Sequence, residues 1–270
     1  MKIALIQMQT GLDKAANLAN AVAEIRSAAA RGADMAVLPE MFCCPYDHKY
    51  FAPYSEPVGG PVWRSLSDAA RENDIWVVGG SFPEAEEGRL YNTCFVFDRT
   101  GRQAARHRKL HLFDVDVTNG PSFRESDTLS AGEDITVFHT EFGTLGLCIC
   151  FDLRFPELFQ LMARAGAQAV LVPAAFNEVT GAAHWELLFR SRAVDAQLYT
   201  VGVSPSRNEK GYRAYGHSIV CSPWAEVLYQ ADYAPCTEIV SLDFKRVAEI
   251  RRQLPLLTAR REDLYQLSAR

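Results

Sequence analysis

The sequence has little of what marks membrane, secreted or nucleic-acid-binding proteins. No apolar run in its 270 residues approaches the length of a membrane span, and residues 1–7 become polar too soon for a secretory leader. The net charge of −5 gives no basic excess that would attract nucleic acid. Seven cysteines are an odd number, and without a secretory context they indicate reduced thiols, not a disulfide framework. We therefore expect a cytoplasmic protein that binds neither membranes nor nucleic acids.

Internal repeats, low-complexity tracts and linker-like stretches are also missing, so we expect a single domain over residues 1–270. Strand patterns alternate with helical patterns early in the chain, and hairpin patterns intervene later. This order predicts an α/β fold, a four-layer α-β-β-α sandwich of two mixed sheets with helices outside. The tail over 253–270 has little core of its own, and we expect it to be a dimer-swapped or docking arm in a homodimer or higher homo-oligomer.

Apolar periodicity predicts the individual elements. Strands are expected over 2–8, 35–38, 75–79, 91–97, 102–108, 136–139, 144–149, 169–172, 198–203, 217–221, 226–229 and 238–242. Helices are expected between an Asp13 cap and Gly32, over 62–70, from Pro156, over 186–196 and over 245–252. The first helix should bury Leu18, Val22, Ile25 and Ala29, and the helix over 186–196 should present one stripe of Leu187, Leu188, Ser191 and Val194. Loops are expected over 41–61, where we expect a cover over a site, and over 119–132.

The segment 144–158 places a cysteine between a strand and a helix. The run 145–149 is apolar and uncharged, which is typical of a strand buried on both faces, and Pro156 begins a helical pattern. Cys150 lies between the two, at the strand end where open α/β sheets place their ligands. Cysteine is also a common core residue, so the local pattern leaves Cys150 open between a nucleophile and a packing residue. For Cys148, inside the apolar run, we expect packing.

Two further reactive residues follow short predicted strands. Glu40 comes after Leu38 and Pro39, and Lys109 comes directly after the strand over 102–108. A carboxylate, an ammonium group and a thiol that converge at strand ends can form a nucleophilic site, because a cation lowers a thiol pKa and a carboxylate can take the proton. Taken singly, Glu40 could instead cap a helix or bind a surface arginine, and Lys109 could lie on a solvated strand edge.

Three segments together resemble the signature segments of the nitrilase superfamily, the carbon–nitrogen hydrolases. They are Pro39-Glu40, 108–113 and 148–158, and similar flanking segments include Leu90–Thr93, Phe123–Ser126, Pro173–Asn177, His184–Leu188, Arg190–Ala193 and Gly216–Ser218. The branch that the chain resembles most is the ω-amidases, which act on the amides of α-keto dicarboxylic acids. The resemblance implies an amidase that hydrolyses a small carboxylate-bearing amide to acid and ammonia through a Cys150 thioester, without a metal or an organic cofactor.

The resemblance also implies roles for individual residues. Cys150 corresponds to the nucleophile, Glu40 to the general base and acid, and Lys109 to the electrostatic partner. Glu125 matches a second glutamate that orients the lysine and the substrate. Phe151 stands where the family often has tyrosine, and its backbone N–H is the expected oxyanion donor.

The remaining expected substrate-binding residues are Tyr46, Arg154 and Phe176. Arg154 is the next cation along the turn from Cys150, and its planar fork suits a substrate carboxylate. A structural ion pair with Asp152 or Glu157 is the alternative for Arg154. Tyr46 could add a hydroxyl donor, and Phe176 lies in a matching flank.

Other interpretations stay open. A cysteine–histidine hydrolase needs an imidazole base, but nothing singles out one of the histidines 48, 107, 111, 139, 184 and 217. Cys43-Cys44 and Cys148-x-Cys150 lack zinc-ligand spacing. Within the superfamily, deaminated glutathione, aliphatic amides, nitriles and N-carbamoyl compounds are alternative substrates, and a non-catalytic interaction protein on this scaffold is the alternative outside enzymes. Ala225 stands where the family usually has glycine, which leaves the shape of the turn at this position open.

Overall fold

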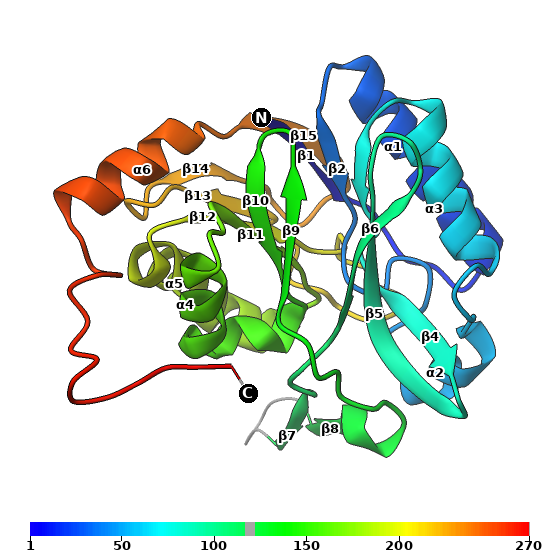
Figure 1. Cartoon of the computed structure of the whole chain (residues 1–270). Coiled ribbons are helices and arrows are strands. Elements are labelled where there is room, and N and C mark those ends of the chain that lie inside the picture. The colour runs from blue at the N-terminus through cyan, green and yellow to red at the C-terminus, as the bar shows by residue number, and fades with distance from the viewer. Residues whose placement is uncertain (117–121, 270) are drawn as a thin grey trace.

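Two large β-sheets packed face to face form the centre of the computed structural model, which describes residues 1–116 and 122–269 (Figure 1). The first sheet has the order β15-β1-β2-β3-β5-β4, with β6 paired to β5. Its strands are β1 (Lys2–Gln7), β2 (Met35–Val37), β3 (Trp76–Val78), β4 (Phe82–Glu86), β5 (Arg89–Phe97), β6 (Gln103–Arg108) and β15 (Cys236–Ser241). Parallel pairing of β1, β2 and β3 directs their carboxyl ends to one edge.

The second sheet has the order β14-β13-β12-β11-β10-β9, and a small third sheet pairs β7 (Asp114–Asp116) with β8 (Ser122–Arg124). The strands of the second sheet are β9 (Thr136–Thr140), β10 (Gly143–Leu147), β11 (Ala169–Pro173), β12 (Tyr199–Val203), β13 (Ile219–Cys221) and β14 (Val227–Gln230). Here too the central strands β10, β11 and β12 are parallel.

Helices cover the outer face of each sheet, so the predicted four-layer sandwich is confirmed. Figure 1 shows α1 (Lys14–Ala30) and α3 (Pro61–Glu72) beyond the first sheet, and α4 (Pro156–Arg164) and α5 (Glu178–Ala196) beyond the second. Strand β1 shows why both of its faces are apolar. Ile3 and Leu5 belong to the core between the sheets, whereas Ala4 and Ile6 pack in the core under α1 and α3.

The buried face of each of two helices differs from the prediction. In α1 the Asp13 cap and the burial of Ile25 are confirmed, but the other buried residues lie one position earlier than expected, and the predicted residues Leu18, Val22 and Ala29 are half-buried beside them. Its buried residues are Asn17, Ala21, Ile25 and Ala28. In α5 the predicted stripe is wrong, because Leu187 is 63% exposed and Val194 is 38% exposed. The buried residues of α5 include Ala193 and the aromatic residues Trp185 and Phe189, whose larger surfaces determine which face packs.

Several segments expected to be loops contain regular structure. The segment 41–61 includes α2 (His48–Tyr54), which begins behind an Asp47 cap. Strand β4 was not predicted, because Pro83, Glu84 and Glu86 are untypical of a strand. It is an edge strand, where proline is tolerated. Of the predicted loop over 119–132, residues 119–121 lie outside the described residues, and the remainder contains β8 and a 3₁₀ turn over Glu125–Asp127.

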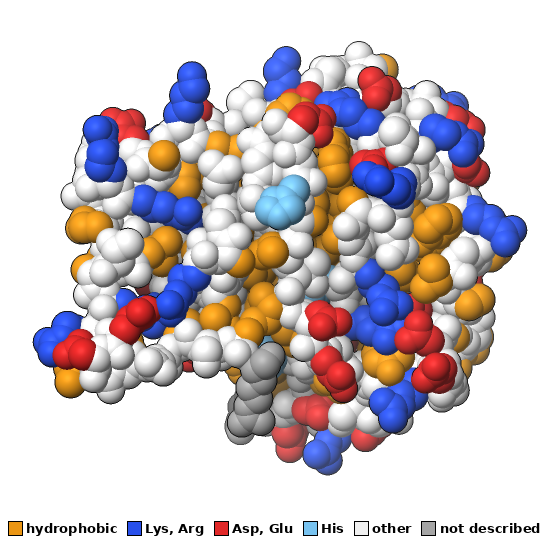
Figure 2. Space-filling view, viewed as in Figure 1, with side chains coloured by type: hydrophobic (Ala, Val, Ile, Leu, Met, Phe, Trp, Pro, Cys, Tyr) orange, Lys and Arg blue, Asp and Glu red, His pale blue; other side chains and the backbone are white. Residues whose placement is uncertain are grey.

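The C-terminal part of the chain consists of α6 (Phe244–Gln253) and an irregular tail. The tail returns along α4, where Arg164 pairs with Glu262 at 2.6 Å and donates to the Leu267 carbonyl at 3.0 Å. On the face shown in Figure 2, basic and acidic side chains are interspersed. None of the helices in the described ranges is both long and apolar enough to cross a membrane.

Candidate active site

Three strands of the two sheets deliver a carboxylate, an ammonium group and a thiol to one point. Glu40 follows β2, Lys109 directly follows β6, and Cys150 follows β10 after two buried residues. Glu40 and Lys109 are fully buried, and Cys150 is 5% exposed. The structure therefore brings together the three side chains that the sequence placed at separate strand ends.

Lys109 lies at the centre of this cluster. Its Nζ is 3.0 Å from Glu40 Oε1, 2.9 Å from Glu125 and 3.5 Å from the hydroxyl of Tyr46. Burial alone would lower the pKa of Lys109, but the adjacent carboxylates of Glu125 and Glu40 outweigh it and raise this pKa well above the ordinary value. Lys109 is consequently a fixed positive charge in a water-poor site.

Glu40 has one oxygen engaged and one oxygen available. Oε1 accepts hydrogen bonds from Asn92 Nδ2 at 2.8 Å and from Lys109, whereas Oε2 has no hydrogen-bond partner among the described residues. Burial raises the pKa of Glu40, and repulsion from Glu125 adds to this, while Lys109 and the Cys150 thiol act in the opposite direction. A carboxylate with a raised pKa and a free oxygen beside a thiol is well suited to accept a proton.

Cys150 occupies a strained backbone position. It begins the 3₁₀ turn Cys150–Arg154 with a φ of +48°, a left-handed conformation that few non-glycine residues adopt. Burial raises the pKa of the Cys150 thiol well above its ordinary value, and the Glu40 carboxylate adds to this, although Lys109 and the Ala175 backbone N–H favour the thiolate. The resting thiol therefore keeps its proton and needs a neighbouring base to become a nucleophile.

Glu125 and Tyr46 complete the buried network. Glu125 is fully buried and accepts from the Tyr46 hydroxyl at 2.5 Å and from the Phe113 N–H at 2.6 Å, as well as from Lys109. The Tyr46 ring packs against Phe123 and Tyr212, with ring centroids 5.5 and 5.0 Å away. These contacts fix the Glu125 carboxylate and, through it, the Lys109 ammonium.

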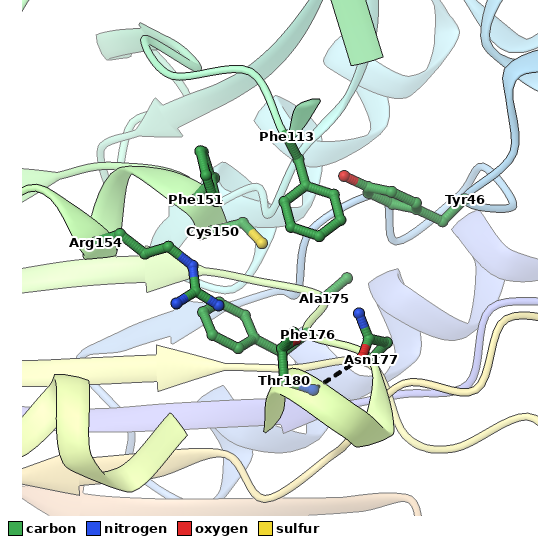
Figure 3. Close-up of a pocket in the computed structure, with 9 residues that line it drawn as sticks. All are labelled: Tyr46, Phe113, Cys150, Phe151, Arg154, Ala175, Phe176, Asn177 and Thr180. Carbon is green, nitrogen blue, oxygen red and sulfur yellow. Dashed lines mark hydrogen bonds between the residues drawn. The ribbon is translucent and has the colours of Figure 1, made fainter. Parts of the chain in front are cut away.

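A small pocket opens in front of the Cys150 sulfur. Figure 3 shows the residues that line it, which are Tyr46, Phe113, Cys150, Phe151, Arg154, Ala175, Phe176, Asn177 and Thr180. In that view the guanidinium of Arg154 lies over the ring of Phe176, and the sulfur of Cys150 points into the space between the rings of Phe113 and Phe176. The walls are thus mainly aromatic, with one cation and a few polar groups, as is usual for a small-molecule site.

Arg154 is the only charged side chain among these lining residues. Its guanidinium carbon is 5.0 Å from the Phe176 ring and 5.6 Å from the Phe151 ring, and Nη1 is 3.3 Å from His184 Nδ1. The alternative pairing with Asp152 or Glu157 is not observed among the described residues. Burial lowers the pKa of Arg154, which indicates a guanidinium partly removed from water.

A second, larger hollow adjoins the cluster on the side of Glu40. Glu40 lines it together with Tyr46 and Ala175, and the last two also border the small pocket. Its rim comes from three segments, 9–12, 44–50 and 205–212. Glu40 thus borders the larger hollow, whereas Arg154 borders the small pocket.

The sequence predicted Glu40, Lys109, Cys150, Glu125 and Tyr46 of the buried cluster but missed four pocket residues, which are Phe113, Ala175, Asn177 and Thr180. Asn177 caps α5 by accepting from the Val179 and Thr180 N–H groups, both at 3.0 Å. An asparagine directly before a helical pattern is a capping signal that could have revealed this earlier start of α5. Within residues 1–116 and 122–269, no group of three or more potential ligand side chains is placed to hold a metal ion.

Comparison with known proteins agrees with this arrangement. The family model named Carbon-nitrogen hydrolase matches residues 2–252. The chain is 47% identical to the omega-amidase NIT2 of Bos taurus, covering 100% of this chain and 98% of that protein. It is also 47% identical to the omega-amidase NIT2 of Homo sapiens, covering 98% and 96%.

Solved structures show the same fold. Nit3 of Saccharomyces cerevisiae, described as a member of branch 10 of the nitrilase superfamily, superposes with a TM-score of 0.88 at 38% identity, covering 97% of this chain and 96% of that chain. An amidase from Nesterenkonia sp. AN1, solved after Michael addition of acrylamide at its active-site cysteine, gives a TM-score of 0.81 at 26% identity and covers 98% of each chain. This chain belongs to the carbon–nitrogen hydrolase family, within the nitrilase superfamily.

Proposed function

We propose that the protein is an ω-amidase that hydrolyses the terminal amide of a small keto dicarboxylic acid through a thioester on Cys150. The observation that carries this proposal is the juxtaposition of the Glu40–Lys109–Cys150 cluster with a pocket whose lining has a single charged side chain, Arg154. The omega-amidase names of the relatives support the same substrate class.

Acylation begins with the transfer of the Cys150 proton to the free oxygen of Glu40 as the sulfur attacks the amide carbonyl carbon. The negative charge that develops on the carbonyl oxygen is stabilised by the Lys109 ammonium and the Phe151 N–H. Phe151 is the second residue of a 3₁₀ turn, where backbone N–H groups lack intrahelical acceptors. Glu40 then returns the proton to the nitrogen, the carbon–nitrogen bond breaks, and ammonia leaves a Cys150 thioester.

Deacylation uses the same groups in reverse. Glu40 takes a proton from water, the hydroxide attacks the thioester carbonyl, and the same donors hold the second oxyanion. Collapse releases the carboxylic acid, and the Cys150 sulfur recovers its proton from Glu40. Because Glu40 borders the larger hollow, ammonia can leave and water can enter on that side without displacing the acyl group.

Substrate selection in this proposal follows from charge. An ω-amide of a keto dicarboxylic acid carries a carboxylate at the end away from the scissile bond, and an unpaired charge in a small pocket is costly. Arg154 can meet that carboxylate, because Lys109 is already occupied by Glu40 and Glu125. Phe176 and Phe151 flank the guanidinium and hold its plane, and Tyr46 closes the pocket beside Glu125.

The proposal is tested by ammonia release from α-ketoglutaramate, with glutamine and a neutral aliphatic amide for comparison. We expect Cys150→Ala to abolish release and Cys148→Ala to keep most of it, because Cys148 is fully buried and belongs to a hydrophobic core cluster. Mass spectrometry of rapidly quenched wild-type protein should detect an acyl adduct on Cys150. An active Cys150→Ala protein, with thermal melts showing that both variants fold, would reject this mechanism.

We also propose that the protein is a cytoplasmic homodimer of this single domain, with the tail over 253–270 as a docking arm. Supporting this, α5 exposes the apolar side chains of Val179, Leu187 and Val194, and an oligomer would remove such a face from water. Sedimentation equilibrium distinguishes a dimer from a monomer. If truncation after residue 252 left the dimer constant unchanged, the tail would have no role in docking.

A further inference from the structure

A buried carboxylate outside the reacting cluster links the two segments that carry Cys150 and Lys109. Asp152 is fully buried and is not among the residues that line either hollow. It lies two residues after Cys150, and its side chain contacts His107 and His111, which flank Lys109 at two residues on each side. One side chain thus spans the nucleophile turn and the lysine segment.

The carboxylate of Asp152 accepts all four hydrogen bonds that its side chain makes with described residues, since an ionised carboxylate can only accept. Oδ2 accepts from the Ile149 N–H at 3.0 Å and from His107 Nε2 at 3.1 Å. Oδ1 accepts from the backbone N–H of His111 at 2.9 Å and from its Nδ1 at 2.8 Å. Burial would raise the pKa of Asp152, but the bonds from His107 and His111 outweigh it and hold the pKa well below the ordinary range.

The bond to Ile149 explains how the strained nucleophile position is held. Ile149 and Asp152 lie on either side of the left-handed Cys150 backbone, so the bond that the Asp152 side chain accepts from the Ile149 N–H closes the turn around it. Left-handed non-glycine residues persist only where the surroundings determine them. Without this bond, Cys150 would relax towards an ordinary backbone conformation and its sulfur would move.

The two histidines fix the other side. His107 is fully buried in β6, and its Nδ1 lies 2.9 Å from Thr136 Oγ1 of β9, which anchors the ring in the sheet region. His111 stacks on Phe155 with a centroid separation of 3.5 Å, at the end of the Cys150 turn. Both rings are therefore held independently, and Asp152 transmits their position to the turn.

We propose that Asp152 is a positioning residue for the hydrolysis reaction, which fixes the Cys150 turn in register with the Lys109 segment through His107 and His111. This inference rests on the proposed function only in that its kinetic test measures amidase activity. Asp152 is expected to act on the rate of the chemical step and not on substrate affinity, because it sets the geometry between sulfur and ammonium without touching the pocket.

The test compares Asp152→Asn with Asp98→Asn. The amide has the shape of the carboxylate, but its NH₂ group cannot accept, so one pair of donors around position 152 loses its acceptor. Asp98 is a matched control, because it is also a buried carboxylate that accepts from two backbone N–H groups and two side chains, in the turn at the opposite end of β6. We expect Asp152→Asn to lower kcat about 100-fold with KM within about threefold of wild type, and Asp98→Asn to leave kcat within about twofold.

Alkylation of Cys150 by iodoacetamide, followed by mass spectrometry across pH, provides a readout independent of amidase activity. We expect slower alkylation and an altered pH profile in Asp152→Asn, and the wild-type profile in Asp98→Asn at a comparable loss of melting temperature. If wild-type protein released no ammonia but its alkylation still depended on Asp152, the proposed substrate would be wrong and the positioning role would stand.

Equal kinetics and alkylation in Asp152→Asn and wild type would overturn the inference, as would equal losses in the two variants. If Asp152→Asn does not fold, His111→Phe takes its place. It keeps the stack on Phe155 and removes one side-chain donor from a half-exposed position. A drop in kcat of about tenfold with an intact fold supports the inference, and wild-type kcat contradicts it.

Discussion

Replacing Arg154 by methionine should separate substrates by charge. Methionine keeps an unbranched side chain that can pack between Phe151 and Phe176, and it removes the guanidinium. Among the described residues Arg154 has no carboxylate partner, so the change strands no buried negative charge in the free protein. We therefore expect the fold to be kept, with a change in unfolding free energy within about 1 kcal/mol.

The expected effect on catalysis comes from the substrate carboxylate, which would lose its partner. Truncating one member of a buried charge pair costs about 2–5 kcal/mol, and a half-buried guanidinium places Arg154 towards the lower end. With a factor of ten for about 1.4 kcal/mol, a loss of 2–3 kcal/mol lowers kcat/KM about 30- to 150-fold for α-ketoglutaramate. A neutral amide of similar length, such as pentanamide, should lose far less.

The assay is kcat/KM for ammonia release on both amides in wild type and variant. Arg190→Met is a suitable control. Arg190 lies on α5, the helix capped by the pocket residue Asn177, but it pairs with Glu186 on an exposed surface. Equal losses on the two amides in Arg154→Met would mean that Arg154 supports the architecture of the site. In that case the ω-amide assignment would lose its mechanistic basis.

Three further predictions concern catalysis, backbone strain and pH. Glu125→Gln should keep the fold and lower kcat about 10- to 100-fold. Glu125 accepts hydrogen bonds from Lys109, Tyr46 and a backbone N–H, and the glutamine NH₂ group leaves one of these donors without an acceptor. A wild-type kcat in this variant would show that Glu125 has no role in catalysis. Ala225→Gly should raise the unfolding free energy by about 0.5–1 kcal/mol in urea melts, because Ala225 has a φ of +62° that glycine adopts freely; a lower value would contradict this account of strain. The pKa of Asp152 is lower in the folded than in the unfolded protein, so the ionised carboxylate stabilises the fold fully above about pH 4. This stabilisation decreases as the pH falls from about 4 towards the folded-state pKa. Between about pH 6 and pH 3, the melting temperature should therefore fall less in Asp152→Asn than in wild type.

The parts of the site that could be predicted are those that follow directly from strand ends. Glu40 and Cys150 each come after a short apolar run, and parallel strands bring their carboxyl ends to one edge of a sheet, so local pattern and topology agree for these two. Lys109 follows β6, a largely polar strand that pairs antiparallel with β5. Their pairing across the two sheets could not be derived locally, because sheet packing joins residues 40, 109 and 150 that are far apart in the chain. The resemblance to a family supplied that step.

The features that could not be predicted depend on which face of a helix packs best in the core and on contacts between residues far apart in the chain. Strand β4 carries Glu84, which would be unfavourable in a buried strand until Arg106 and Arg108 of β6 are placed beside it at 2.8–3.1 Å. A sequence pattern records the charge of Glu84 but not the two arginines that neutralise it across the sheet. The strand therefore exists because of a tertiary contact, and propensity alone assigns it to a loop.

Helix α5 shows the same competition and bears directly on the site. The leucine and valine stripe through Leu187 and Val194 suggested the wrong buried face, since the core instead contains Trp185 and Phe189, whose tilted rings have centroids 4.7 Å apart. Because Trp185 also packs edge-on against Phe176 at 5.2 Å, the face that α5 buries determines where the pocket wall under Arg154 lies. The helix thus uses its aromatic face to shape the proposed carboxylate site and leaves its aliphatic face outward. An exposed aliphatic stripe on a helix whose other face is already in the core indicates a second contact surface. The residues wrongly predicted to be buried in the core therefore support the proposed homodimer interface.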